Sequence, residues 1–276
     1  MNVGVHVFDK NVNKVVEYCE RIGVNHICLA CSSITGYDEQ GYPKLDSLRA
    51  FMNTLEDADI SVPTMVISRW PSPDVLLGKP SGSEEFMNLC KTLEVLGEAS
   101  VGSILIYPNL DRPMDRSEEA ECWKLLLSVY QRLVDYAEKA GVRIGNHAYY
   151  HPWKLVRNVE TLMRLITEVP SPYNGITYCP GLYQSGDNVY EAVTLFGKKI
   201  FFTHARDIRR PKSGPYQFEE VFLGEGEVDL PKVVKLLQAV DYQGIICPEH
   251  LGASSVEGED LEAQAVAYLK KLLASS

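Results

Sequence analysis

The sequence has few of the features that mark an exported or membrane-inserted chain. Its 7 cysteines are an odd number without a regular disulfide framework, which favours a reduced compartment. The first residues lack the basic region and apolar run of a signal peptide, and no stretch reaches the roughly 18 apolar residues of a membrane helix. We therefore expect a cytoplasmic protein without a membrane partner.

Positive charge is also scarce. Lys and Arg number 27 against 37 Asp and Glu, which gives a formal net charge of −10. An acidic chain repels nucleic acid and anionic membranes, so we expect neither as a partner. An anionic small molecule would have to be met by local Arg or Lys side chains.

The remaining composition is that of an ordinary globular enzyme, with 45% hydrophobic and 23% charged residues. A length of 276 residues suits one (β/α)₈ barrel, and no linker or low-complexity tract divides the chain. We predict a single domain over residues 1–276. Association into a homo-oligomer is left open, because nothing in the sequence defines an interface.

Short apolar, β-branched runs alternate with longer amphipathic stretches, which indicates βα units around a parallel sheet. The amphipathic stretches include residues 12–22, 83–97, 117–140, 156–168, 230–240 and 261–273. We expect eight strands, at Val3–Val7, His26–Leu29, Val62–Ile67, Ser103–Ile106, Arg143–His147, Gly175–Cys179, Ile200–His204 and Gly244–Pro248.

The loops on the two sides of these strands differ. Segments that lead into strands are short and contain glycine, as at Gly23 and Gly141, whereas segments after strands are long and rich in proline, aromatic and charged residues. This asymmetry is typical of a barrel whose site lies at the C-terminal ends of its strands. A doubly wound open sheet competes, but no glycine-rich dinucleotide loop follows the first strand. We predict an α/β fold, a single (β/α)₈ TIM barrel.

Each of the last four predicted strands ends on a side chain that can bind a metal: His147, Cys179, His204 and Glu249. In a closed barrel, consecutive strand ends lie side by side on one rim, so these residues can converge. Two imidazoles, a thiolate and a carboxylate balance a divalent cation and leave a position for substrate. The thiolate favours zinc and an oxygen ligand from a substrate would favour manganese, so the donor set leaves the metal open.

These motifs resemble the xylose-isomerase-like barrel superfamily. Within it, Tyr178-Cys179-Pro180-Gly181, Phe202 to Asp207, Phe218-Glu219-Glu220 and Pro248-Glu249-His250 are similar to mannonate dehydratases. The resemblance implies one manganese ion on His147, Cys179, His204 and Glu249, with Arg206 contacting substrate and His250 as acid or base. The chain departs from that family at His147-Ala148-Tyr149-Tyr150-His151-Pro152, where the family has His-Pro-Asp-Asp-Pro-Pro, and at Glu249, where Asp is usual.

The resemblance leaves three functions to weigh. A dehydratase would act on a sugar acid through an enediolate. An isomerase or epimerase would use the same enediolate, but the epimerases of the superfamily generally carry Glu, Asp, His and Glu at these strand ends. With His147 in the first position, their two-carboxylate proton relay is absent, which favours the lyase. A non-catalytic sugar-binding or accessory barrel should have lost metal ligands, and all four are present.

Other residues are assigned to substrate by their place on loops after strands. His151 is a candidate to assist departure of the hydroxyl, and His6, Phe8 and Tyr183 are weaker candidates to line the pocket. The basic run at 206–212 is interpreted as an exposed loop or a carboxylate clamp, and residues 224–227 as a turn. The candidates for binding a small sugar or sugar acid are Arg69, Trp70, Tyr107, Asn109, Tyr149 and Tyr150.

Overall fold

The computed structural model describes residues 1–67, 71–109, 114–149, 151, 153–182, 189–210, 218–252 and 260–275. Its main sheet runs in the order β1-β11-β8-β7-β6-β5-β4-β3-β2, with every pairing parallel. The strands are β1 (Asn2–Val3), β2 (Val5–Val7), β3 (His26–Ala30), β4 (Ser61–Val66), β5 (Ser103–Ile106), β6 (Arg143–His147), β7 (Asn174–Tyr178), β8 (Ile200–Ala205) and β11 (Ile245–Pro248).

The sheet closes on itself through its first strand. β1 pairs with β11 and β2 pairs with β3, and only Gly4 separates β1 from β2. A Cβ at Gly4 would lie 3.0 Å from the carbonyl oxygen of His26, so glycine lets the strand change partners there. The two ends of the strand order are thus one continuous piece of chain, which excludes the open doubly wound sheet and confirms the predicted barrel.

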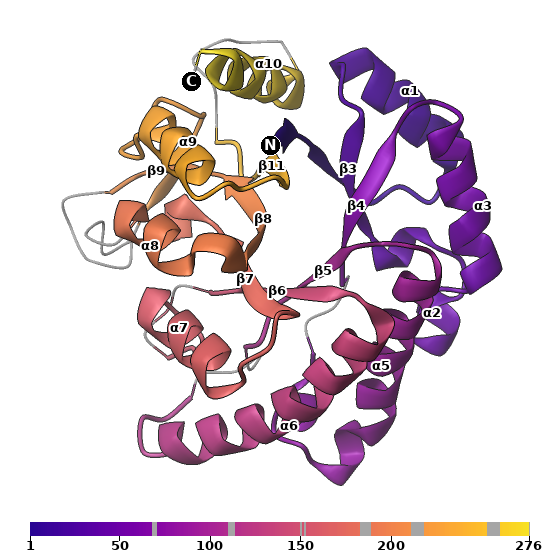
Figure 1. Ribbon diagram of the computed structural model, residues 1–276, viewed down its shortest axis with the longest axis vertical. Helices are drawn as coiled ribbons and strands as arrows, with labels where there is room; N and C mark the ends of the chain where they lie inside the picture. The colour runs from indigo at the N-terminus through magenta and orange to yellow at the C-terminus, as the bar shows by residue number, and fades with distance from the viewer. Residues whose placement is uncertain are drawn as a thin grey trace.

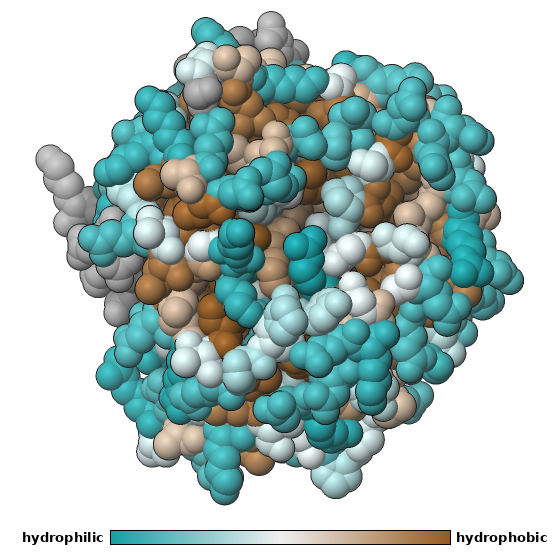
Figure 2. Space-filling view, in the orientation of Figure 1, coloured by the Kyte–Doolittle hydropathy of each residue, from teal (hydrophilic) through white to brown (hydrophobic). Residues whose placement is uncertain are grey.

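Helices surround the barrel and are arranged as a ring in Figure 1. With β1 and β2 counted as one strand, each strand of the closed sheet is followed by at least one helix, as a (β/α)₈ barrel requires. Figure 2 shows hydrophilic side chains over most of one face, with apolar side chains between them. The helices are α1 (Val12–Ile22), α2 (Tyr37–Gln40), α3 (Leu45–Glu56), α4 (Pro73–Leu76), α5 (Ser83–Glu98), α6 (Glu119–Ala140), α7 (Val159–Glu168), α8 (Val189–Phe196), α9 (Leu230–Ala239) and α10 (Leu261–Ala274).

Local signals explain where several helices begin and end. The side chain of Asn11 caps α1 by accepting from the backbone of Asn13 and Lys14, and Gly23 ends that helix at φ 71°. Asn158 and Thr161 form a capping box at the start of α7. None of the described helices is both long and apolar enough to cross a membrane.

The core has two parts, which follow from the alternation of side chains along each strand. Ile27 and Leu29 face the helices and join the large cluster between helices and sheet, whereas Cys28 and Ala30 belong to a smaller cluster. That smaller cluster fills the barrel interior and consists of Cys28, Ala30, Val66, Leu105, Phe202, Ile245 and Cys247.

The eight predicted strands agree with the structure to within one residue at most ends, and the first is divided at Gly4. The basic run at 206–212 differs from the exposed loop that the sequence suggested. Residues Asp207–Arg209 form β9, which pairs antiparallel with β10 (Glu219–Val221), and both Arg206 and Asp207 are buried. Burial is possible because Glu220 and backbone N–H groups satisfy these two charged side chains.

Candidate metal centre

Four side chains at the ends of neighbouring strands meet at one rim of the barrel. His147 ends β6, Cys179 follows β7, His204 is the penultimate residue of β8, and Glu249 follows β11. These strands are consecutive neighbours in the sheet. One ligand atom from each residue lies within 4.8 Å of the other three, and the group is buried or nearly so. The cluster is therefore a candidate metal site, and its four members are those that the sequence singled out.

The shortest distances in the cluster centre on His204. Its Nδ1 lies 3.1 Å from Nε2 of His147 and 3.3 Å from Oε2 of Glu249. The thiol of Cys179 lies 3.5 Å from the same carboxylate oxygen. Each neutral imidazole carries only one N–H, so the four side chains present more hydrogen-bond acceptors than donors to one another. A cation is the partner that all four atoms can bind at once.

Burial determines the protonation of the cluster. Desolvation lowers the pKa of His147 to about 3 and the pKa of His204 well below its usual value, so both rings are neutral at pH 7. Desolvation also raises the pKa of the Cys179 thiol and of the Glu249 carboxyl, because each would be a buried anion. A divalent cation would reverse the second effect by stabilising the thiolate and the carboxylate.

Arg206 is anchored beside the cluster by a residue from the next hairpin. Its Nε donates to Oε2 of Glu220 at 3.1 Å and its Nη2 donates to Oε1, which makes a bidentate pair. Its Nη1 lies 3.7 Å from Oε2 of Glu249. Burial alone would lower the pKa of Arg206, but Cys179, Glu220 and Glu249 raise it above its usual range. The guanidinium therefore stays charged.

His250 has a backbone conformation that few side chains adopt. Its φ is 49°, in the left-handed region, where a residue with a Cβ costs about 1–2 kcal/mol. Its Nε2 lies 3.8 Å from Oε1 of Glu249, and its Nδ1 lies 3.8 Å from Oε1 of Glu220. The ring is 54% exposed, so it stands at the open edge of the cluster. Such strain is found at functional sites, where the surrounding structure compensates for it.

A cavity of about 420 Å³ opens beside these residues. Tyr107 lies on its wall, and the Tyr107 ring centroid is 5.0 Å from that of His147. The volume suits a small ligand. His6 and Phe8, the weaker pocket candidates from the sequence, both line it. The described residues that line it are His6, Phe8, Val66, Ile67, Tyr107, Pro248, Glu249 and His250.

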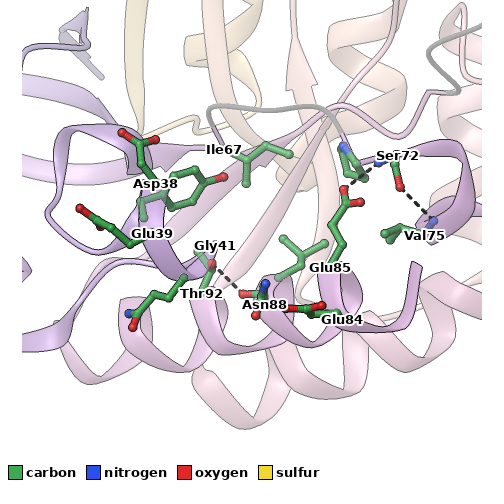
Figure 3. A pocket seen from close by; sticks show the side chains of 14 residues that line it. Asp38, Glu39, Gly41, Ile67, Ser72, Val75, Glu84, Glu85, Asn88 and Thr92 are labelled. Atoms are coloured by element: carbon green, nitrogen blue, oxygen red, sulfur yellow. Dashed lines mark hydrogen bonds between the residues drawn. The ribbon is translucent and has the colours of Figure 1, made fainter. Parts of the chain in front are cut away.

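A second cavity, of about 500 Å³, lies between α2, α4 and α5 and is drawn in Figure 3. Its lining includes the carboxylates of Asp38, Glu39, Glu84 and Glu85, and Oε1 of Glu85 accepts the backbone N–H of Ser72 at 2.8 Å. None of the four metal-binding candidates lines it, and among the described residues only Ile67 is shared with the first cavity. Because Glu249 and His250 line the first cavity and not the second, we place the candidate site at the first cavity.

The other residues that were expected to contact substrate do not share one location. The amide of Asn109 is fully buried and binds both backbone groups of Val156 at 2.9 Å, so its polar atoms are already used within the chain. The His151 ring stacks on Trp153 with centroids 4.5 Å apart and lies 5.2 Å from the ring of Tyr149. Arg69, Trp70, Tyr150 and Tyr183 lie outside the described residues.

Two residues next to the centre make contacts that the sequence did not predict. Glu220 is the last residue of the Phe218-Glu219-Glu220 motif, and its carboxylate accepts a hydrogen bond from Nε of Arg206. His6 has its Nε2 only 2.9 Å from Nε2 of His204. The available signal for His6 was its place at the end of the first strand, on the same rim as the four ligand candidates.

Comparison with known proteins defines the class of the chain. The family described as xylose isomerase-like TIM barrel matches residues 16–272. The chain therefore belongs to the xylose isomerase-like TIM barrel family.

Individual relatives refine this assignment. The mannonate dehydratase of Thermotoga neapolitana is 26% identical over 87% of this chain and 77% of its own length. The mannonate dehydratase of Endomicrobium trichonymphae is 25% identical over 48% of this chain, and the match spans only 39% of that relative.

Solved structures show the same fold at lower sequence identity. The mannonate dehydratase of Streptococcus suis serotype 2 superposes with a TM-score of 0.83 at 19% identity, covering 100% of this chain and 94% of that one. The D-psicose 3-epimerase of Clostridium cellulolyticum H10, solved with D-tagatose, gives 0.76 at 14% identity and covers 99% of both chains. The barrel is thus common to lyases and epimerases, and the fold alone does not distinguish them.

Proposed function

We propose that this chain is a divalent-metal-dependent hydro-lyase that removes water from a sugar acid. The observation that carries the proposal is the convergence of two imidazoles, a thiol and a carboxylate within 4.8 Å, beside a cavity of about 420 Å³. The similarity to mannonate dehydratases over 87% of this chain supports both the reaction and the sugar-acid substrate class.

The charges around the cluster fit a dication. Glu220 neutralises Arg206 through their bidentate pair, and the two histidines are neutral. The ionised forms of Cys179 and Glu249 then leave two negative charges in a buried place, which one divalent cation balances. We propose manganese, which the resemblance to mannonate dehydratases implies, with zinc as the competitor that the thiolate favours.

When bound, the cation supplies Lewis acidity that polarises a carboxylate or carbonyl oxygen of the substrate. His250 is the proposed base, because its ring stands at the edge of the cavity and is accessible. It takes the proton from the carbon next to the substrate carboxylate, which leaves an enediolate. The carboxylates of Glu249 and Glu220, each 3.8 Å away, stabilise the imidazolium that forms.

Loss of a hydroxyl from the neighbouring carbon completes the dehydration. A proton must reach the departing oxygen, and His250, now protonated, or His151 supplies it. Tyr107 and Tyr149, with Arg69, Trp70, Asn109 and Tyr150, were the proposed sugar contacts, and Tyr107 has the strongest support because it lines the cavity. Asn109 has the weakest, since Val156 occupies its amide.

Arg206 has a more specific role than the sequence suggested. Its Nε and Nη2 are held by Glu220, so it binds a substrate carboxylate bidentately only if Glu220 gives up that pair. With the pair intact, only Nη1 remains near the centre, 3.7 Å from Glu249. We propose that Arg206 orients Glu249 and contributes one N–H to the substrate.

The first experiment measures bound metal by elemental analysis of the purified protein. We expect one equivalent of manganese or zinc in the wild type and almost none in Cys179→Ala or His204→Ala. Cys122→Ala is the matched control, because it removes a buried thiol from α6 and should leave the metal in place. Absence of stoichiometric metal in the wild type, or its full retention in both ligand variants, would refute the site.

The second experiment separates the candidate functions. The metal-loaded protein is incubated with a panel of aldonates, and 2-keto-3-deoxy products are measured. A parallel panel of ketoses is followed for epimers. Dehydrated products support the proposal, and epimers alone would replace it with an epimerase. Binding of sugars without turnover of either panel would indicate a non-catalytic barrel.

A further inference from the structure

A contact between two histidines that are 198 positions apart in the sequence lies next to the cluster. His6 is on β2 and His204 is on β8, and their Nε2 atoms are 2.9 Å apart. His204 is fully buried and His6 is half-buried. Two neutral imidazoles at this distance share one hydrogen, so one Nε2 donates and the other accepts.

Without a cation, the cluster has more of its hydrogen-bonding groups satisfied when His6 donates this hydrogen bond and His204 accepts it. Nδ1 of His204 faces two acceptors, Nε2 of His147 at 3.1 Å and Oε2 of Glu249 at 3.3 Å. A proton on that Nδ1 satisfies them, and then Nε2 of His204 must accept from Nε2–H of His6. Nδ1 of His6 is buried without a hydrogen-bond partner among the described residues, and here it carries only a lone pair.

A cation at the cluster requires the opposite direction of the His6–His204 hydrogen bond. A metal binds a lone pair, so Nδ1 of His204 must lose its proton. Neutral His204 then carries its proton on Nε2 and donates it to Nε2 of His6. His6 takes its own proton on Nδ1. In the balance, the shared proton moves from His6 to His204, one proton leaves Nδ1 of His204 for solvent, and one is taken up at Nδ1 of His6.

We propose that His6 is a positioning residue for the metal centre, and that metal binding reverses the His6–His204 hydrogen bond. Its function is the one that a carboxylate or carbonyl often has behind a metal-bound histidine, which is to fix the ring and its tautomer. A histidine differs from those partners because it can also donate. It can therefore stabilise His204 both with and without the ion. The inference rests on the proposed metal site.

The test compares metal affinity in the wild type and three variants, one of which is a matched control. His6→Phe keeps a ring against Phe8 and Phe202 but cannot accept, so we expect manganese and zinc to bind roughly 10–100-fold more weakly. His6→Gln offers an amide oxygen as acceptor and should recover most of the affinity. His26→Phe is the control for replacing a histidine by phenylalanine. His26 is the first residue of β3, at the end of the strand away from the cluster, so this variant should bind both metals as tightly as the wild type does.

Titration calorimetry with MnCl₂ and ZnCl₂ gives these affinities without any assay of turnover. Histidine ¹⁵N chemical shifts recorded without metal and with Zn²⁺ give the tautomers directly. We expect the protonated nitrogen of His204 to change from Nδ1 to Nε2 and that of His6 to change from Nε2 to Nδ1.

The outcomes separate the inference from the proposed function. If the wild type binds metal and His6→Phe binds it equally well, the positioning role is wrong and the metal site stands. If the tautomers are the same with and without Zn²⁺, the reversal is wrong. If the wild type binds neither ion, both the inference and the proposed site are refuted.

Discussion

Asp207 offers a stringent test of how the rim beside the metal centre is held together. It is fully buried at the start of β9, and its carboxylate accepts four backbone N–H groups. Oδ1 accepts from Ile208 and Val228 at 2.9 and 3.0 Å, and Oδ2 accepts from Gly224 and Gly226 at 3.0 and 2.9 Å. The carboxylate therefore binds the 224–228 turn to the strand that follows Arg206.

The perturbation is Asp207→Asn, which keeps the shape of the side chain. Either orientation of the amide places its NH₂ against two backbone N–H donors, so two hydrogen bonds are lost. A hydrogen bond to a charged group contributes about 1.5–3 kcal/mol, so we expect the loss of two to lower the unfolding free energy by about 3–6 kcal/mol. At about 2–4 °C per kcal/mol for a chain of roughly this size, that corresponds to a loss of roughly 6–24 °C in melting temperature.

The assay is urea unfolding followed by circular dichroism and tryptophan fluorescence, with chelator present so that bound metal does not mask the change. Asp135→Asn is the control, because Asp135 is exposed on α6 and the substitution removes the same charge. A loss below about 1 kcal/mol in Asp207→Asn, or an equal loss in the control, would show that the four bonds do not stabilise the turn as argued.

Three further predictions concern the site and its supports. His250→Asn keeps a residue that tolerates the left-handed conformation, so we expect an unchanged melting temperature and a loss of turnover of about 10²-fold or more in the aldonate assay. Asn158→Ala removes the capping box of α7 and should cost about 1 kcal/mol in urea unfolding, whereas Asn13→Ala, in the exposed first turn of α1, should cost less. Removal of metal with a chelator should lower the melting temperature of the wild type, with a contribution of about 2.7 kcal/mol lost at a metal concentration 100-fold above the dissociation constant, and should have no effect in His204→Ala.

The barrel was predictable because its signals are local. A parallel strand buried on both faces reads as an apolar run, and the residue after the run lies at the rim. His147 and His204 were placed in this way, and Cys179 and Glu249 follow the same rule. Their closeness in space needed only the assumption that the sheet closes.

The supports of the site were less predictable, because they depend on contacts between distant loops. β9 and β10 have three residues each, which is too short for a readable alternation, so the Arg206–Glu220 clamp could not be derived. Asn109 has the sequence signature of an exposed polar loop residue, yet its partner Val156 is 47 positions away. Nothing in a single sequence pairs these two loops.

The closure of the sheet by its last strand has a consequence for assembly. β11 lies between β1 and β8, and Glu249 follows it. The fourth candidate ligand therefore takes its place at the rim only when β11 pairs with β1 and β8. A nascent chain that has not yet added β11 carries three ligand candidates and two unpaired strand edges. An ion bound by all four candidate ligands would hold together residues from four strands of the finished barrel and would oppose its reopening.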